Sequence, residues 1–268
     1  MKFLDYLNLG YIRVKSYPSL RRIWSATDRD YGEIRINYGY ERVPGPDEHV
    51  FGGLVKLQDL NRVFPQSTGR PNILYLVSSA LPYFPIRLVK MARKNGAKIV
   101  LNQNGVAYPG WYGEGYQKEN RSNAYVHSVA DYVFYQSRFC QISAEKYLGE
   151  LSPKQSSEIL YNPVDTMTFY PRKDKTSKDR TTILLSGSHW TTYRVYTAIE
   201  ALNIILCSRA DVTLRIAGRF CWHTDTKKAE FEVFAYAKQA GVENHVQYSG
   251  SYSQEAAPAL MNECSILM

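Results

Sequence analysis

The chain has 268 residues, of which 44% are hydrophobic and 13% aromatic, so it can bury one large core or two modest ones and disorder is disfavoured. The formal net charge of +8 fits nucleic acid, an anionic membrane face or a phosphorylated small molecule and does not choose among them. The four scattered cysteines argue against a zinc site and a disulfide framework, and no apolar run reaches the roughly 18 residues of a membrane span. We therefore expect a compact cytoplasmic protein with neither a signal peptide nor a membrane helix.

The first half of the chain alternates short apolar runs with helical patterns. Residues 1–30 give mixed signals and receive no assignment apart from a short helix around 18–24. Strands are expected at 34–38, 72–77, 97–103, 131–136 and 157–162. The helices between them follow Gly52 and Gly53, begin at Pro85, and begin again after Ser137, which is an expected N-cap. This alternation predicts parallel strands joined by right-handed crossovers.

The alternation starts afresh after the charged segment "RKDKTSKDR". Strands are expected at 182–185, 212–216 and 246–248, and a further strand begins in "CSILM" at 264–268. Helices are expected over 195–205 and 227–241 and from Ser253 onward. We therefore predict two α/β units, residues 1–171 and 181–268, joined by an exposed linker at 172–180. The second unit is expected to be partial, because its last strand has no covering helix.

Several motifs occur in an order that one known family shares. Residues Asn162, Val164, Asp165, Phe169 and Pro171 of "YNPVDTMTFYP" match a crossing segment N-x-V-D-x-x-x-F-x-P. The segment "ADYVFYQS" precedes it, and "ILLSG", "VTLRIAG" and "VQYSGSYSQEAAPALMNECSILM" follow it. In this order, over residues 34–268, the chain resembles the retaining glycosyltransferases of family 4, also called group 1, which have the GT-B fold. The resemblance implies two Rossmann-like domains, an N-terminal domain on the acceptor side and a partial C-terminal domain that binds a nucleotide sugar.

The same resemblance implies an activity. It implies retaining transfer of a sugar from a nucleoside-diphosphate sugar to a glycan or lipid-linked acceptor, without metal or other cofactor. The positive charge would suit that donor and a peripheral contact with an anionic membrane at the inner face, and nucleic acid is not an expected partner. Two departures stand out. The chain stops before the Glu-x7-Glu motif of the family, and Asn104 stands where many members place a histidine at the reaction centre.

Glycine-rich turns after strands are candidate phosphate sites, because backbone N–H groups and a helix N-terminus favour anions there. Gly52 and Gly53 form one such turn and Gly187 with Ser188 another, although an ordinary tight turn explains either equally well. The resemblance places Gly52 and Gly53 at the interdomain cleft near acceptor and phosphate, and Gly187 at the donor diphosphate. Arg194 stands one position later than the family's lysine, and we expect it to neutralise the diphosphate, the alternative being a solvated arginine.

Further candidates follow other strand ends. The segment "NQNGVAYPGWYGEGY" offers amides, a glycine and Trp111 for a sugar, or else a polar turn with Trp111 filling a domain seam. His189 is the best candidate among the histidines, whereas His127 is expected on a helix surface or in the core. In the family, the loop holding Ser251 and Tyr252 binds the nucleotide base; the alternative is a plain turn. The catalytic candidates are Asn104 and Arg194; the substrate-binding candidates are Gly52, Gly53, Gly105, Gly187, Ser188, His189, Gly218, Ser251 and Tyr252; no metal ligand is expected.

Three other classes of protein fit parts of this pattern. A truncated or inactive paralogue would bind sugar nucleotides or protein partners without turnover. A sugar-nucleotide epimerase has a related architecture and would act without an acceptor. A nucleic-acid-binding protein is disfavoured, because the basic residues are spread among acidic ones and form no contiguous stripe.

Overall fold

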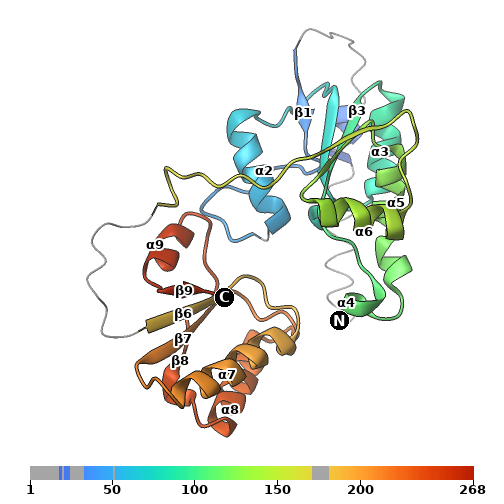
Figure 1. Ribbon diagram of the computed structural model, residues 1–268. Coiled ribbons are helices and arrows are strands. Elements are labelled where there is room, and N and C mark those ends of the chain that lie inside the picture. The colour runs from blue at the N-terminus through green and yellow to red at the C-terminus, as the bar shows by residue number, and fades with distance from the viewer. Residues whose placement is uncertain (1–17, 20, 25–32, 51, 171–180) are drawn as a thin grey trace. The chain divides into compact units, whose positions relative to one another are not determined.

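The computed structural model describes residues 18–19, 21–24, 33–50, 52–170 and 181–268. These residues divide into two compact units (Figure 1). The first contains the described residues up to Gly45 together with Gly52–Pro163, and the second contains 46–50 and the described residues from Val164 onward. The predicted linker 172–180 lies outside the described residues, and the predicted domain boundaries stay a prediction.

The described part of the first unit forms a five-stranded sheet in the order β1-β2-β3-β4-β5, with every pairing parallel. The strands are β1 (Ile36–Asn37), β2 (Ile73–Val77), β3 (Lys98–Gln103), β4 (Tyr132–Tyr135) and β5 (Ser156–Ile159). The helices are α2 (Gly52–Val63), the 3-10 turn η1 (Ser78–Ala80), α3 (Pro85–Lys94), α4 (Pro109–Tyr112), α5 (Tyr116–Val129) and α6 (Arg138–Leu148). The five predicted strands are confirmed, as is the N-cap, because the Ser137 side chain accepts from the Cys140 N–H.

The sheet of the first unit is covered on both faces. Leu74 and Leu76 of β2 pack with α3, α5 and α6, whereas Tyr75 and Val77 pack with Leu57 of α2. Figure 1 shows the same division, with α2 on one side of this sheet and α3, α5 and α6 on the other. The connections β1-α2-β2 and β2-α3-β3 step the same way along the sheet but cover opposite faces, so they have opposite hands. Our expectation of right-handed crossovers throughout is therefore wrong for one of these two connections.

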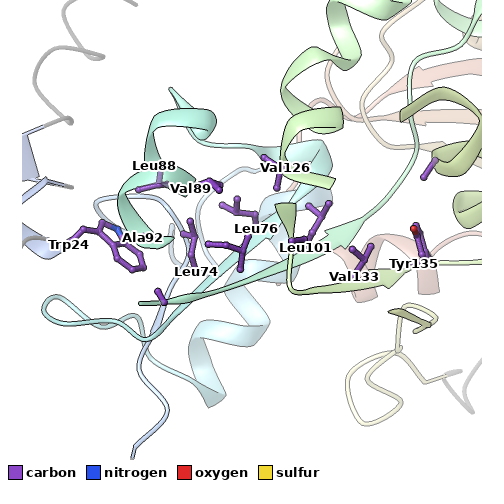
Figure 2. Close-up of a cluster of buried hydrophobic side chains, with 14 of the residues drawn as sticks. Trp24, Leu74, Leu76, Leu88, Val89, Ala92, Leu101, Val126, Val133 and Tyr135 are labelled. Atoms are coloured by element: carbon purple, nitrogen blue, oxygen red, sulfur yellow. The ribbon is translucent and has the colours of Figure 1, made fainter. Parts of the chain in front are cut away.

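The N-terminal region contributes to the larger core of the first unit. Residues 18–19 and 21–24 are helical, and Trp24 is only 1% exposed. Its ring belongs to the cluster that holds Leu74, Leu88 and Ala92, and Figure 2 shows Trp24 at one end of this cluster and Tyr135 at the other. The short helix expected here is thus present, and it closes one end of the core.

Gly53 allows α2 to approach the end of β2. Gly52 and Gly53 are the first residues of the helix and do not form the separate loop that the sequence suggested. A Cβ at Gly53 would lie 2.6 Å from Ser79 Oγ and 2.7 Å from Ala80 Cβ, whereas a Cβ at Gly52 would meet nothing within 4 Å. The close approach of α2 to η1 therefore requires glycine at the second position only.

Substitution of these two glycines separates packing from helix propensity. We expect Gly53→Ala to lower the free energy of unfolding by about 1–3 kcal/mol, because the added methyl overlaps η1. Gly52→Ala is the matched control and should be neutral or slightly stabilising, because alanine favours a helix and the site is open. Urea unfolding monitored by circular dichroism gives both values. Equal values for the two variants would contradict the packing role of Gly53.

The described part of the second unit forms a four-stranded parallel sheet in the order β8-β7-β6-β9. Its strands are β6 (Thr181–Ser186), β7 (Val212–Ala217), β8 (Val246–Tyr248) and β9 (Ile266–Leu267). Its helices are α7 (Thr192–Leu206), α8 (Thr226–Gln239), the 3-10 turn η2 (Glu243–His245) and α9 (Ala257–Asn262). The predicted strands and the first two helices are confirmed. The last helix begins later than expected: Ser253 Oγ accepts from the Ala256 N–H, but only at Ala257 does α9 start.

The strand order of the second unit reverses at β6. Helices α7 and α8 pack on the face that carries Ile183 and Leu185, and α9 packs on the opposite face against Leu184. Strand β7 lies on one side of β6 and β9 on the other. Open α/β sheets bind ligands at the carboxyl ends of the strands beside such a switch point. The loop that follows β6 is therefore the place to look for a site.

Candidate functional site

Three glycine-containing loops meet at the carboxyl edge of the second sheet. Gly187, Gly218 and Gly250 follow β6, β7 and β8 and have φ angles of 110°, 115° and 70°. The Gly187 N–H donates to Ala217 O at 3.1 Å, and the Gly218 N–H donates to Gly250 O at 2.7 Å. Tyr248 adds a third link, because its hydroxyl donates to Gly218 O at 3.0 Å. These bonds fix the ends of three strands beside the switch point.

Gly218 permits the closest contact in this group of loops. A Cβ at this position would lie 1.9 Å from the carbonyl oxygen of Gly187 and 2.7 Å from its carbonyl carbon. Both atoms belong to the backbone, so no side chain can turn aside to make room. Gly218, predicted from the sequence as a substrate-binding residue, thus has a structural role that is visible in the packing. Its contact with substrate stays a prediction.

Arg194 reaches back from α7 to the end of β6. Its Nη2 donates to the Ser186 carbonyl oxygen at 2.8 Å, and its Nη1 lies 3.5 Å from where a Cβ of Gly187 would be. The guanidinium is exposed and has further N–H donors beyond the one that bonds Ser186. Among the described residues, α7 has no acidic side chain in its first turn and no side-chain cap from Thr191. The loop after β6 is therefore bordered by a cation and by the positive end of a helix.

His189 lies beneath this loop as a neutral side chain. It is 0% exposed, and its backbone pairs with the segment after β7, with its N–H donating to Arg219 O at 2.9 Å and its carbonyl accepting from the Cys221 N–H at 2.8 Å. Because Nε2 lies 3.2 Å from Ala217 O, this nitrogen carries the proton, and Nδ1 is an acceptor with no partner in the described residues. The pKa of His189 is lowered to about 4, mainly by burial and also by the Arg194 cation, against the bond to Ala217, which raises it. The positive charge beside Gly187 therefore comes from Arg194 and not from His189.

The remaining candidates of the second unit lie along the same edge. Ser188 is half-buried and Ser251 is exposed. Tyr252 packs against the cluster of Leu184 and Leu260 on the α9 face. Sequence analysis missed Phe220, which is 0% exposed and stacks on Tyr248 with ring centroids 4.5 Å apart. The feature of the sequence that could have indicated Phe220 is its position, two residues after Gly218.

A second polar cluster occupies the carboxyl edge of the first sheet. Asn104 is 9% exposed; its N–H donates to Ser78 Oγ at 2.8 Å and its side-chain amide donates to Ser79 Oγ. Its Oδ1 accepts from Gln136 Nε2 and, at 3.4 Å, from Lys56 Nζ. The predicted catalytic Asn104 therefore bonds the ends of three strands to one another. Its neighbour Gly105 is exposed and its carbonyl accepts from Gln103 Nε2 at 3.1 Å.

Lys56 belongs to this cluster and was missed by sequence analysis. Its Nζ donates to Asn102 Oδ1 at 2.9 Å, and burial lowers its pKa from 10.5 to about 8. The available signal was helical spacing: Lys56 lies three residues after Gly53 and on the same stripe as Leu57 and Leu60. A lysine in a buried stripe is uncommon and is informative for that reason.

His127 is a core residue of the first unit. It is 1% exposed and its Nε2 lies 2.8 Å from the hydroxyl of Tyr135. Of the two placements expected from the sequence, the core is correct. Burial lowers its pKa to about 4, so each unit contains one buried histidine, His127 or His189, that is neutral at pH 7.

We expect the buried histidines to make the protein labile to acid. In the folded chain their pKa values are near 4, below the unfolded value of 6.5, so the unfolded chain binds more protons between these values. The contribution of each histidine to the free energy of unfolding is fully present above about pH 6.5. It is lost as the pH falls towards 4 and amounts to at most about 3 kcal/mol for each histidine. Urea unfolding at a series of pH values measures the loss. His127→Gln should flatten the pH dependence, whereas the matched variant His49→Gln, at an exposed residue, should not.

Neither a metal-binding cluster nor a membrane-spanning helix is found among the described residues. Within the described ranges, no group of three or more His, Cys, Asp or Glu side chains could hold a metal ion. None of the helices in the described part of the chain combines the length and apolarity that crossing a membrane requires.

Two parallel sheets, each in a Rossmann-like unit, with glycine loops at a switch point define the class: the chain has the fold of the GT-B glycosyltransferases, and the predicted fold class is confirmed. HepE from Anabaena in complex with UDP-glucose is similar, with a TM-score of 0.55 and 16% identity over 73% of this chain and 52% of that one. HepE in complex with UDP and glucose has a TM-score of 0.55 and 16% identity, over 82% of this chain and 58% of that one. Sucrose-phosphate synthase from Thermosynechococcus elongatus has a TM-score of 0.56 and 10% identity, over 79% of this chain and 52% of that one.

The chain thus spans between 52% and 58% of the length of these solved structures. No protein-family model and no curated protein sequence matches it. At these identities the likeness concerns the fold, and the chemistry depends on the residues of this chain.

Proposed function

We propose that the chain is a glycosyltransferase whose second unit binds a nucleoside-diphosphate sugar at the loop after β6. The observation that carries the proposal is the position of Arg194, whose guanidinium lies over Gly187 at the carboxyl end of β6 and beside the switch point. HepE, a protein of similar fold, has been solved with UDP-glucose, which supports a donor of this class. Family 4, to which the order of motifs points, is part of the same proposal.

The chemistry needs a group that stabilises the leaving diphosphate. In a retaining transfer the bond between the anomeric carbon and the diphosphate oxygen breaks, and the acceptor oxygen bonds to that carbon on the same face. The acceptor hydroxyl gives up its proton to the leaving diphosphate.

Arg194 and the N–H groups at the start of α7 would bind the negative charge that develops on the diphosphate, and this interaction strengthens as the bond breaks. No metal ion is required for this account.

The acceptor side belongs to the first unit in this proposal. A glycan or lipid-linked acceptor would bind near Gly52, Gly53 and Gly105, with Trp111 available for stacking because it is 63% exposed. The basic composition would support contact with an anionic membrane from the cytoplasmic side. Ser251 and Tyr252 remain the proposed contacts of the nucleotide base.

A transfer assay tests the proposed activity. The chain is incubated with UDP-, GDP- and ADP-linked hexoses and with a panel of glycan and lipid-linked acceptors, and products are detected by mass spectrometry. Proton NMR of the new glycosidic bond then reports the anomeric configuration. We expect a product with the configuration of the donor. A product of inverted configuration would overturn the retaining assignment.

A second function is favoured by one observation. Both side-chain atoms of Asn104 are bonded within the protein, to Ser79 and Gln136, so the expected reaction-centre position is already engaged. A paralogue that binds sugar nucleotides without transfer would have this property. Saturable binding of a nucleoside-diphosphate sugar without product from any acceptor would support the binding protein over the enzyme.

A further inference from the structure

Lys56 places a positive charge inside the carboxyl edge of the first sheet. It is half-buried on α2, and its Nζ donates to Asn102 Oδ1 at 2.9 Å and to Asn104 Oδ1 at 3.4 Å. Both partners are neutral amides. Within the described residues no carboxylate forms an ion pair with Lys56, in contrast to Lys98, which pairs with Asp131 at 3.1 Å.

The hydrogen-bond partners of Lys56 are neutral groups. Asn102 bonds the hydroxyl of Tyr75 at 3.2 Å, and burial raises the pKa of Tyr75, so that phenol stays protonated. Asn104 is held by Ser79 and Gln136. The titratable groups that face Lys56 are the Cys140 thiol on α6 and, through Asn102, Tyr75. The hydrogen-bonded group of Lys56, Asn102, Asn104 and Tyr75 therefore has a net charge of +1 when Lys56 is protonated.

An ammonium group in this position lacks charge compensation. Two of its three N–H donors are used by amide oxygens, and the third forms no hydrogen bond with the described residues. Partial burial weakens its hydration, and a charge without a partner in such a place is unfavourable. Gly53 maintains this arrangement, because it lets α2 lie against η1. A negatively charged ligand would complete both the hydrogen bonding and the charge.

We propose that Lys56 binds a singly charged oxyanion, a carboxylate or a phosphodiester, at the carboxyl edge of the first sheet. One cation matches one negative charge, and the surrounding amides and hydroxyls suit an oxygen ligand. In naming this oxyanion as part of the sugar acceptor, the inference rests on the proposed function. The acceptor would then be a uronic acid-containing glycan or a lipid phosphodiester.

Binding should depend on pH in a defined direction. Because Lys56 has a pKa of about 8 in the ligand-free chain, a bound anion raises this pKa and binding takes up a proton at higher pH. Affinity is therefore constant well below pH 8 and falls as the pH rises through 8. Lys56→Arg keeps the charge throughout this range and should remove the decrease.

Calorimetric titration with two pairs of probes tests the proposal without any donor. Glucuronate is compared with glucose, and dimethyl phosphate with the neutral trimethyl phosphate. We expect one of the anions to bind and its neutral counterpart not to, and the binding pair identifies a uronate or a phosphodiester as the source. Equal binding of anion and neutral probe, or binding of neither anion at millimolar concentration, would overturn the proposal.

Three variants assign any binding to Lys56. Lys56→Met should weaken the binding of the anion at least about tenfold, which is the effect expected from the loss of one charged hydrogen bond. Lys94→Met, at an exposed lysine in the last turn of α3, makes the same change of charge and should bind as the wild type. Lys56→Arg should bind with no decrease above pH 8. Wild-type affinity in Lys56→Met would refute the site.

Two controls separate this inference from the proposed function. Thermal unfolding of Lys56→Met should show a folded chain of at least wild-type stability, because the substitution removes an uncompensated charge. Its affinity for nucleoside diphosphates should equal that of the wild type, because Lys56 belongs to the first unit. Loss of anion binding with intact diphosphate binding supports the Lys56 site, whereas normal anion binding without diphosphate binding contradicts only the proposed function.

Discussion

Gly218→Ala is expected to unfold or severely destabilise the second unit. The added Cβ would lie 1.9 Å from Gly187 O, and the residue has a φ of 115°, a conformation that alanine rarely adopts. The backbone strain alone costs about 1–3 kcal/mol, and separation of the two loops adds to it, so we expect a total loss of at least about 4 kcal/mol. Urea unfolding monitored by tryptophan fluorescence measures this loss.

A second glycine in the same unit separates the cost of the backbone conformation from the cost of the steric overlap. Gly241 has a φ of 71°, but a Cβ there would meet nothing within 4 Å. Gly241→Ala should therefore show the cost of the backbone conformation without the overlap, about 1–2 kcal/mol. If Gly218→Ala destabilises the chain no more than Gly241→Ala does, this result would contradict the close contact between the loops after β6 and β7.

Phe220→Ala is expected to have the second-largest effect, a loss of about 3–5 kcal/mol in the free energy of unfolding. The ring is 0% exposed and lies between Tyr248, at 4.5 Å, and Trp222, at 4.9 Å, with His189 at 5.7 Å. Its removal leaves a cavity against His189 and admits water there. The pKa of His189 should then rise towards its usual value, because burial is what lowers it.

An exposed phenylalanine gives the matched control. Phe231 on α8 is 74% exposed, and Phe231→Ala should change stability by less than about 0.5 kcal/mol. NMR titration of the histidine side chains in Phe220→Ala reports the pKa of His189. An unchanged stability and an unchanged titration would both contradict the buried position of Phe220.

Much of the fold could be predicted because it depends on local pattern. Parallel strands covered on both faces are short apolar runs, and such runs identify β2, β3 and β7. Val195, Ala198, Ile199 and Leu202 recur at helical spacing, and the structure buries all four on one face of α7. The N-cap at Ser137 is equally local, because a hydroxyl and an N–H three residues apart are sufficient.

The elements that sequence analysis missed lack such a pattern. Helix α5 buries Val126 but also two polar side chains, Asn120 and His127, so its apolar period is weak. Asn120 is satisfied by a pair of bonds to the backbone of Ala107, at 2.9 and 2.8 Å, which only the folded chain brings together. The burial of Trp24 likewise depends on residues more than 40 positions away.

The candidate site was predictable in its parts but not in its geometry. Loops after strands and the cation Arg194 could be found by spacing, because carboxyl ends of parallel strands share one edge. The contact of Gly218 with Gly187 and the bond of Arg194 to Ser186 depend on strand order, which spacing does not determine. The same applies to Lys56, whose amide partners come from another strand of the first unit.

Equilibrium binding tests most directly whether the loop after β6 and Arg194 bind a diphosphate. Calorimetry with UDP, GDP and ADP is performed on the wild type, on Arg194→Ala and on Arg209→Ala, which removes an arginine paired with Asp211 before β7. We predict that at least one nucleoside diphosphate binds, that Arg194→Ala weakens it about 10- to 100-fold, and that Arg209→Ala does not. Failure of all three to bind the folded wild type, or equal affinity in Arg194→Ala, would contradict the account.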